Sequence, residues 1–392
     1  MTAKTGPGPI RNPALRFLRN HVRNRLVSSG AKTPSYGYIT LETVCNSRCN
    51  YCNMWETKKG NQPTTQEWKT IIDDIAALGT VTLTFSGGEP FLNRDLFELA
   101  GYARAQGLVT MVVTNLSKFQ SDWVEKVDQN FDFFGTSIDS TRPEVYLATR
   151  GVDWLERNQR SIRTLMTGLA ERKSKTTVCA MVTVSNRNAY EIHEIQHMVF
   201  DDLGMDAISF NLLDPQGSPT ARWYVPTPEQ VDYYRRVVLD HKNQFPISNS
   251  RRYLEQAGKF DYQCNPWKSI QIDHEGTLIA PCLFIKGGRY NLRQSRLRDV
   301  WNLASTQAIY EQYATCKTCN LGCVVESSWS TTDLAFTLNE SVRSMVLPAL
   351  LRVRARNRGT VVRKPCAFTY PSMVYSPPEM VETPLPMVRG NA

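Results

Sequence analysis

Apolar residues along the middle of the chain alternate between two spacings, one typical of strands and one typical of helices. Short runs rich in β-branched residues predict strands, and apolar positions three or four residues apart predict amphipathic helices. The strands are predicted at 38–44, 81–85, 109–115, 131–139, 176–185 and 207–213. The helices are predicted at 65–78, 94–106, 152–172, 190–202 and 228–243. This rhythm predicts an α/β fold of six βα units, with ligand sites at the carboxyl ends of the parallel strands.

A second region follows this sheet. A β-hairpin is predicted from strands at 269–273 and 277–280, joined by His274-Glu275-Gly276. The predicted domains are therefore a parallel-sheet domain at 36–250 and a smaller domain at 251–330, between a basic helical segment at 1–35 and a tail at 331–392.

The segment before the sheet is predicted to form a basic amphipathic helix at 12–29. Asn12 is suited to the N-cap, Pro13 to the first turn and Gly30 to the position just past the end. Its apolar positions are Leu15, Leu18, Val22 and Leu26, and its arginines are Arg16, Arg19, Arg23 and Arg25. Such a helix can lie on an anionic membrane or bind a phosphate-rich partner. The pattern favours the plainer interpretation, in which the apolar stripe packs on the barrel and the arginines are solvated.

Two further segments follow the second domain. Residues 338–358 are again apolar and basic, whereas 370–386 are rich in proline and aromatic residues and are predicted to form an extended strap. The positive charge of the chain belongs to its two ends. Residues 1–40 carry seven Lys/Arg and no acidic residue, and 341–392 carry eight against two, while 41–340 carry 31 against 35.

Composition narrows the class of protein. The 392 residues are 41% hydrophobic with a net charge of +9, as in an ordinary globular protein. No run of 18 apolar residues predicts a membrane span, and the charged N-terminus has no apolar signal segment. Ten cysteines in such a chain indicate metal ligation in a reducing compartment rather than disulfides, so we expect the cytoplasm. The basic ends are also compatible with peripheral contact at the inner face of an anionic membrane.

Three cysteines just after the first predicted strand carry the strongest chemical signal. Cys45, Cys49 and Cys52 follow a C-x3-C-x2-C spacing, and thiolates this close together bind one soft-metal centre. A single zinc normally takes four ligands, whereas three cysteines suit an iron-sulfur cube with one iron left open. Taken alone, a zinc or redox cluster remains an alternative.

This octapeptide resembles the signature of the radical SAM superfamily, with Tyr51 at its aromatic position. After the second predicted strand, Ser86 is followed by a Gly-Gly-Glu-Pro sequence that resembles the GGEP motif of the same family; its residues are Gly87, Gly88, Glu89 and Pro90. The resemblance implies a partial (β/α)6 TIM-like barrel. It also implies that this motif binds the amino group of S-adenosylmethionine (SAM), and glycines allow such close backbone approach.

Other polar residues at the ends of predicted strands become candidate SAM contacts through the resemblance. They are Asn115 on the third strand, Ser137 and Asp139 on the fourth, and Asn211 on the sixth. Arg150 resembles an arginine that is common after the fourth strand and is a candidate carboxylate partner. Each could instead cap a helix or stabilise a loop.

A second group of cysteines lies in the smaller domain. Its members are Cys264, Cys282, Cys316, Cys319 and Cys323. Their order resembles the twitch domain, a shortened SPASM module that holds one auxiliary 4Fe-4S cluster. The resemblance assigns the first four as ligands, although Cys323 could replace Cys319. A four-cysteine zinc site is the alternative that spacing alone would allow. The five histidines and Cys179 are predicted to be structural, and Cys366 has no predicted role.

The function implied by the resemblance is reductive cleavage of SAM at the first cluster. The resulting 5'-deoxyadenosyl radical abstracts hydrogen from a substrate, and an auxiliary cluster would favour net oxidation. A small polar substrate such as a sugar or cyclitol is expected, with an electron donor such as flavodoxin or ferredoxin. The alternatives are a lipid or polyprenyl-linked substrate at a membrane, and a peptide maturase, which usually needs a longer segment before its first cysteine. A nucleic-acid binder with basic tails would have no use for the GGEP sequence.

Overall fold

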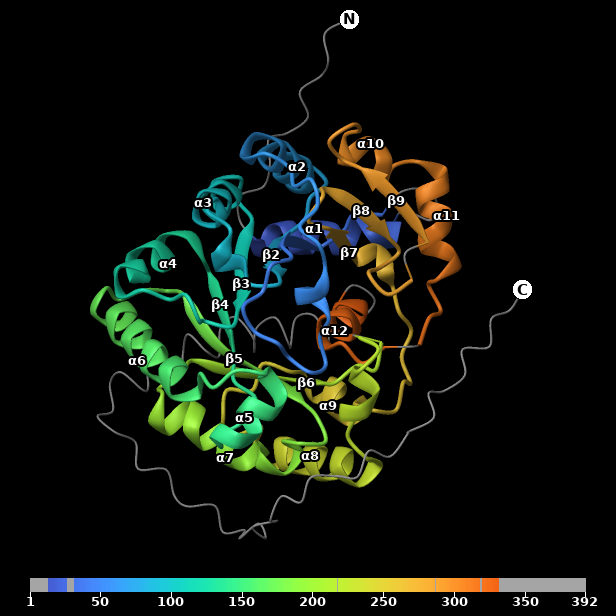
Figure 1. Ribbon diagram of the computed structural model, residues 1–392. Helices are drawn as coiled ribbons and strands as arrows, with labels where there is room; N and C mark the ends of the chain where they lie inside the picture. Colours follow the sequence, from blue (N-terminus) through green and yellow to red (C-terminus); the bar gives the residue numbers. More distant parts are fainter. Residues whose placement is uncertain (1–12, 27–31, 217, 286, 318, 331–392) are drawn as a thin grey trace, which may run out of the picture.

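The computed structural model describes residues 13–26, 32–216, 218–285, 287–317 and 319–330. Six parallel strands form the barrel sheet, in the order β6-β5-β4-β3-β2-β1. They are β1 Tyr36–Glu42, β2 Thr82–Gly87, β3 Val109–Thr114, β4 Phe133–Ser137, β5 Thr177–Val184 and β6 Ala207–Leu212. Figure 1 shows these strands on the inner side of a curved outer layer of helices. The predicted α/β fold with six parallel strands is confirmed.

The second region continues the same sheet. β7 (Ser269–Ile272) pairs in parallel with β1, and β8 (Thr277–Ala280) and β9 (Gly288–Asn291) follow antiparallel, which gives nine strands. The sequence predicted the hairpin but neither its junction with β1 nor β9. The junction places the second group of cysteines beside the first strand of the barrel. The predicted segments 338–358 and 370–386, and Cys366, lie outside the described residues.

Helices cover the outside of the barrel. They are α2 Thr65–Ala77, α3 Leu96–Ala105, α4 Val124–Asn130, α5 Pro143–Arg150, α6 Leu155–Glu171, α7 Ile192–His197 with a π-helical extension Met198–Asp202, and α8 Pro228–His241. The second region adds α9 Arg251–Gln256, α10 Leu297–Trp301, α11 Ala304–Gln312 and α12 Gly322–Ser330. The predicted capping box of α2 is confirmed, since Thr64 Oγ1 accepts from Glu67 N at 3.3 Å and Glu67 Oε2 accepts from Thr64 N at 2.7 Å.

The N-terminal helix α1 (Pro13–Leu26) packs at the amino-terminal end of the barrel, but with the opposite face to the one expected. Arg16 and Asn20 are 1% and 0% exposed, whereas Leu18 and Val22 are each 48% exposed. The prediction that the apolar stripe packs on the barrel was therefore wrong. The reason lies in the turn between α2 and β2, where two backbone carbonyl groups accept from polar side chains of α1. Arg16 Nη1 donates to Thr80 O at 2.8 Å and Asn20 Nδ2 to Gly79 O at 2.7 Å.

Three histidines on α7 and α8 pack together. The ring centroid of His193 lies 4.6 Å from that of His197 and 5.1 Å from that of His241. Burial and the neighbouring histidines lower the pKa of His193 and His241, although Asp240 opposes this for His241. The sequence analysis missed this cluster, even though His193 and His197 are four residues apart on one helix.

This cluster predicts that the protein loses stability in mild acid. The unfolded chain binds protons at His193 and His241 near pH 6.5, whereas the folded chain binds them there only at lower pH. We therefore expect the free energy of unfolding to fall as the pH drops below about 6.5. Replacement of His193 by Asn should make this fall shallower, because it removes one such group and a neighbour of His241. Urea unfolding between pH 7.5 and pH 5 measures both slopes, and equal slopes would contradict the prediction.

Candidate active site

The first group of cysteines lies on the loop that follows β1, at the carboxyl end of the barrel. The end of α5 holds this loop by backbone hydrogen bonds, from Arg48 N to Arg150 O at 3.1 Å and from Asn50 N to Thr149 O at 3.0 Å. Gly151 ends α5 with φ of +67°, and a Cβ there would lie 2.3 Å from Arg48 O. Glycine is therefore required for the close approach of the two segments.

The three thiols of this loop lie within electrostatic range of one another. Burial raises the pKa of Cys49 to about 11; Arg150 opposes the rise, and Cys52, Asp139 and Cys45 add to it. Burial also raises the pKa of Cys45, whose sulfur lies 3.8 Å from Asn115 Nδ2. Thiolates are unfavourable in this setting unless positive charge balances them. A bound iron cluster supplies that charge.

A buried ion pair lies directly behind Cys49. Arg150 Nε lies 2.6 Å from Asp139 Oδ2, and Tyr51 donates its hydroxyl to the same carboxylate oxygen. The other oxygen of Asp139 accepts from Thr183 N at 2.8 Å, and Arg150 Nη1 lies 3.8 Å from the sulfur of Cys49. Asp139 thus joins the cysteine loop to β5. Three predicted site residues come together here, with each other as partners, and their contacts with SAM stay predictions.

The GGEP sequence ties the ends of three strands together. The carboxylate of Glu89 is fully buried and accepts from Thr114 Oγ1 at 2.6 Å, Asn115 N at 2.7 Å and Phe91 N at 3.1 Å. A Cβ at Gly87 would lie 2.1 Å from Glu42 O, so this glycine lets β2 pass close to the end of β1. Close approach of the protein's own backbone is therefore a reason for this glycine that the sequence did not reveal. The predicted contact of this motif with SAM remains a prediction.

The remaining candidates lie at the same end of the sheet, but in two places. Asn115 Nδ2 donates to Asn46 Oδ1 at 2.9 Å and to Ser47 Oγ at 3.1 Å, inside the cysteine loop. Ser137 is buried at the end of β4. Asn211 on β6 instead lies against the start of α12, in the second region.

A further residue at this site had no signal in the sequence. Asn158 is buried in the first half of α6 and donates to Asn115 O at 2.9 Å and to the hydroxyl of Tyr146 at 3.0 Å. It therefore positions Asn115 next to the cysteine loop. An asparagine inside a helix gives no indication of such a role until the strand beside it is known.

Four cysteines of the second group also come together. Cys264 N donates to Cys316 O at 3.2 Å, and the hydroxyl of Tyr262 lies 3.1 Å from the sulfur of Cys319. Burial, together with Cys319, Cys316 and Cys282, raises the pKa of Cys264. The structure therefore brings together the four predicted ligands as free thiols. Cys323 lies on α12, but its side chain is outside the described part of the chain.

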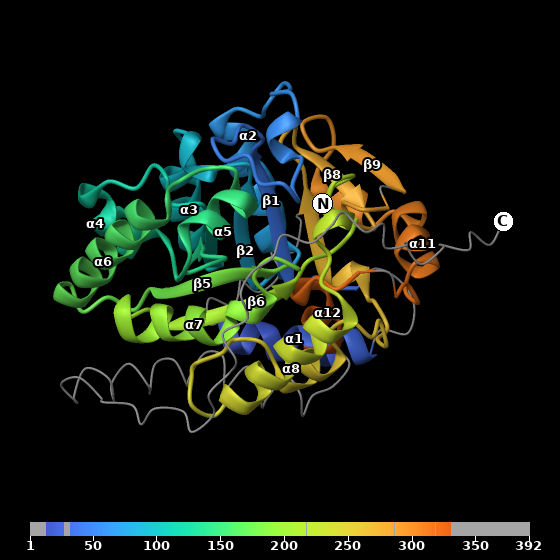
Figure 2. The ribbon, with the colours of Figure 1, turned by 60° about the horizontal axis from the view of Figure 1, so that its bottom comes forward.

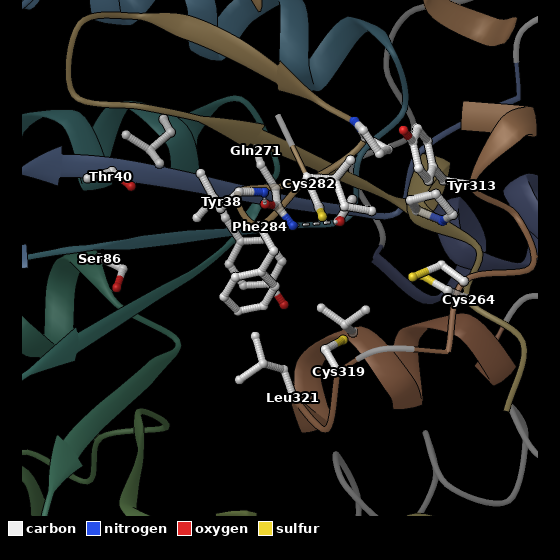
Figure 3. A pocket seen from close by; sticks show the side chains of 18 of the residues that line it. Tyr38, Thr40, Ser86, Cys264, Gln271, Cys282, Phe284, Tyr313, Cys319 and Leu321 are labelled. Atoms are coloured by element: carbon white, nitrogen blue, oxygen red, sulfur yellow. Dashed lines mark hydrogen bonds between the residues drawn. The ribbon is translucent and has the colours of Figure 1, made fainter. Parts of the chain in front are cut away.

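A cavity of about 210 Å³ lies between the ends of β1 and β2 and the second group of cysteines. Thr40, Ser86 and Gly87 line it from the barrel. All four predicted ligands of the second group line it from the other side: Cys264, Cys282, Cys316 and Cys319. Figure 3 shows Tyr38, Phe284 and Leu321 around the same space. Most of the other lining residues are apolar, among them Ile39, Met54, Leu283, Ile285 and Val324.

Comparison with known proteins identifies the family to which the barrel is similar. Residues 39–193, which hold the first cysteine group and the GGEP sequence, match the model of the radical SAM superfamily. The chain contains a radical SAM domain at these residues. Residues 216–343 match a domain of unknown function, DUF3463.

This chain matches only part of the length of each of its curated relatives. An Fe-coproporphyrin III synthase of Methanosarcina barkeri is 35% identical over 25% of each chain. An AdoMet-dependent heme synthase of the same organism is 32% identical over 45% of this chain and 50% of the relative. The matches to these two relatives thus span half of their length or less.

Solved radical SAM structures share the fold. Streptococcus suis SuiB bound to precursor peptide SuiA superposes with a TM-score of 0.63 at 16% identity, over 83% of this chain and 78% of that one. The enzyme anSMEcpe with bound AdoMet gives a TM-score of 0.56 at 15% identity, over 82% of this chain and 98% of that one. At this identity the likeness concerns the fold alone.

The residues of the first group fit the cofactors that radical SAM proteins bind, a 4Fe-4S cluster and SAM. Three free thiols lie on one loop, with the N–H groups of Asn115 and Arg150 next to two of the sulfurs. When bound, such a cluster would supply the single electron needed for reductive cleavage of SAM. The chain itself supplies the ligands, orients them through Asp139 and Asn115, and buries Cys49 away from water.

Proposed function

We propose that this radical SAM protein cleaves SAM reductively and uses the 5'-deoxyadenosyl radical to abstract hydrogen from a substrate held in the 210 Å³ cavity. The position of this cavity supports the proposal. It reaches from the ends of β1 and β2 to the second group of cysteines. The first cysteine loop begins just after β1, and the GGEP sequence begins at the last residue of β2. The second group of cysteines lines the cavity, and Met54, two residues after Cys52, lines it from the segment that follows the first group.

The lining favours a substrate whose reacting part is apolar. A sugar or cyclitol needs a hydrogen-bond partner for nearly every hydroxyl group, because a buried polar group without one loses free energy. Beside the polar Thr40 and Ser86, the cavity presents mainly aliphatic, proline and aromatic side chains. Gln271, another polar lining residue, is engaged with Ser269 and with the backbone of Leu283. The lining therefore supports the lipid-like alternative over the expected sugar or cyclitol.

The second group of cysteines is proposed to hold an auxiliary 4Fe-4S cluster. Cys264, Cys282, Cys316 and Cys319 line the same cavity, and the other three interact electrostatically with Cys264. Four thiols would suit zinc as well as a cluster. A cluster fits the proposed reaction better, because it can accept the electron that a substrate radical must lose in an oxidation. The net reaction is then oxidation of the substrate, with a small one-electron donor of the flavodoxin or ferredoxin kind reducing the first cluster. The cytoplasmic location remains a prediction.

The experiment compares two substrate pools. The reconstituted, reduced enzyme is given SAM with either the lipid fraction or the water-soluble fraction of cells grown in deuterated medium, and deuterium in 5'-deoxyadenosine is measured. We expect enrichment with the lipid fraction only. Enrichment with the water-soluble fraction alone would contradict an apolar substrate. Enrichment with neither fraction would contradict the proposed abstraction of hydrogen from a substrate.

A variant of the lining links this result to the cavity. Leu283 lines the cavity and is 38% exposed, so Leu283→Asn should leave folding intact and weaken the enrichment several-fold. Leu303 is 46% exposed and does not line it, so Leu303→Asn is the matched control. Equal enrichment in the two variants would show that the substrate binds elsewhere.

A further inference from the structure

The outward face of α1 combines exposed apolar and basic side chains. Leu15, Leu18 and Val22 are 56%, 48% and 48% exposed. At about 100° per residue, these three fall on one narrow stripe along the helix, and Arg19 and Arg23 follow along one side of it. Both arginines are exposed as residues, and Arg19 Nη2 also donates to Asn20 Oδ1 at 3.4 Å. We call these five residues the outer face of α1.

The pattern of burial on α1 is the reverse of that on an ordinary surface helix. A helix on a globular protein buries its apolar stripe and exposes its charged one. On α1, Arg16 and Asn20 are buried as donors to Thr80 O and Gly79 O, and Asn24 Nδ2 donates to Thr33 O at 3.0 Å. The helix is therefore attached to the barrel by polar groups. Hydrogen bonds to the barrel fix which side points outward, and this leaves the apolar stripe in water.

We propose that the outer face of α1 binds an anionic lipid surface. An apolar stripe with arginines beside it is the pattern of helices that lie in the membrane interface, where leucine and valine enter the acyl boundary and arginines meet headgroup phosphates. Because α1 is already held on the barrel, binding does not require the helix to fold first. The part of the chain that the structure describes has no helix long and apolar enough to cross a bilayer.

Charge argues against two other occupants of this face. Residues 341–392 of the same chain carry eight basic residues against two acidic ones, so they would be repelled by Arg19 and Arg23. A second copy packed face to face would bring the same two arginines of each chain together. An anionic surface attracts all of these charges at once, the basic C-terminal segment included.

The position of α1 keeps lipid binding away from the cavity. Its contacts are with Gly79 and Thr80, which precede β2, and with Thr33, which precedes β1, so it lies at the amino-terminal end of the barrel. The cysteine loop and the cavity lie at the opposite, carboxyl end. Figure 2 shows α1 below the barrel strands. Lipid binding through α1 thus holds the enzyme at a membrane without covering the cavity, and it is independent of the proposed reaction.

Sedimentation of the full-length protein with phosphatidylserine-rich vesicles tests the inference. We expect binding at low salt that weakens as salt is added, and little binding to phosphatidylcholine vesicles. The triple variant L15N/L18N/V22N should bind at least about tenfold more weakly, because it removes the apolar area that would enter the lipid. The variant R19Q/R23Q should bind several-fold more weakly and lose part of the salt dependence. All five positions are exposed, so the melting temperature of each variant should stay close to that of the wild type.

Leu303→Asn is the matched control, since Leu303 is 46% exposed on the second region. It should bind vesicles like the wild type. If the triple variant also binds like the wild type, the basic ends of the chain bind lipid without α1 and the inference is wrong. It is equally wrong if no vesicle binding occurs, or if light scattering shows a wild-type dimer that the triple variant converts to a monomer. SAM cleavage is measured in parallel, and its presence or absence bears only on the proposed reaction.

Discussion

Alanine at Cys45, Cys49 and Cys52 together should abolish the formation of 5'-deoxyadenosine from SAM. These thiols lie on one loop and are the predicted ligands of the first cluster, and no other cysteine of the described chain belongs to this loop. The wild type should bind about eight irons after anaerobic reconstitution, and the triple variant about four, because a 4Fe-4S cluster has four irons. Iron and sulfide analysis, with chromatography of the nucleoside, measures both results.

Cys179→Ala is the control for this experiment. Cys179 is buried in β5 and is not expected to be a ligand, so its replacement should leave both the iron content and SAM cleavage unchanged. SAM cleavage by the triple variant would contradict the assignment of the first group. About four irons in the wild type and none in the triple variant would support the first cluster and contradict the auxiliary one. Zinc bound at Cys264 and its neighbours would do the same.

The sequence predicted the elements that have strong local patterns. The strands of the barrel are short, largely apolar runs, and several of them, such as β3 and β5, are rich in β-branched residues. α2 carries a capping box that fixes where it begins. The spacing of Cys45, Cys49 and Cys52 is local too, so it could be recognised without a structure. The short helices α4 (seven residues) and α10 (five residues) were missed, because so few residues carry little periodicity.

The remaining features depend on contacts between distant segments. Pattern alone could not reveal that Arg16 would be buried, because the carbonyl group that it binds, that of Thr80, is 64 residues away. The junction of β7 with β1 is likewise set by tertiary pairing and not by any residue in the hairpin. The partner of Arg150 also depends on tertiary packing, which places Asp139 beside it. In each case a polar group is satisfied by a partner that only the fold brings near.

Replacement of Arg150 by methionine should destabilise the protein by about 3–5 kcal/mol, the usual cost of removing one partner from a buried ion pair. The carboxylate of Asp139 is fully buried and would keep only the hydroxyl of Tyr51 and the amide of Thr183 as partners. Urea unfolding of the cluster-free protein measures this loss without a contribution from iron. Arg160→Met is the control, because Arg160 and Glu156 form a pair on the surface, where such pairs contribute less than about 1 kcal/mol.

The double variant D139N/R150M separates the charge from the packing. It leaves no unpaired charge, so it should lose less stability than the sum of the two single variants. Because Asp139 also holds Tyr51 beside Cys49, each single variant should release iron from the first cluster faster than the wild type, while the second group keeps its metal. If Arg150→Met loses no more stability than Arg160→Met, the ion pair does not stabilise the fold. If its stability falls but iron release is unchanged, Arg150 supports the barrel and not the cysteine loop.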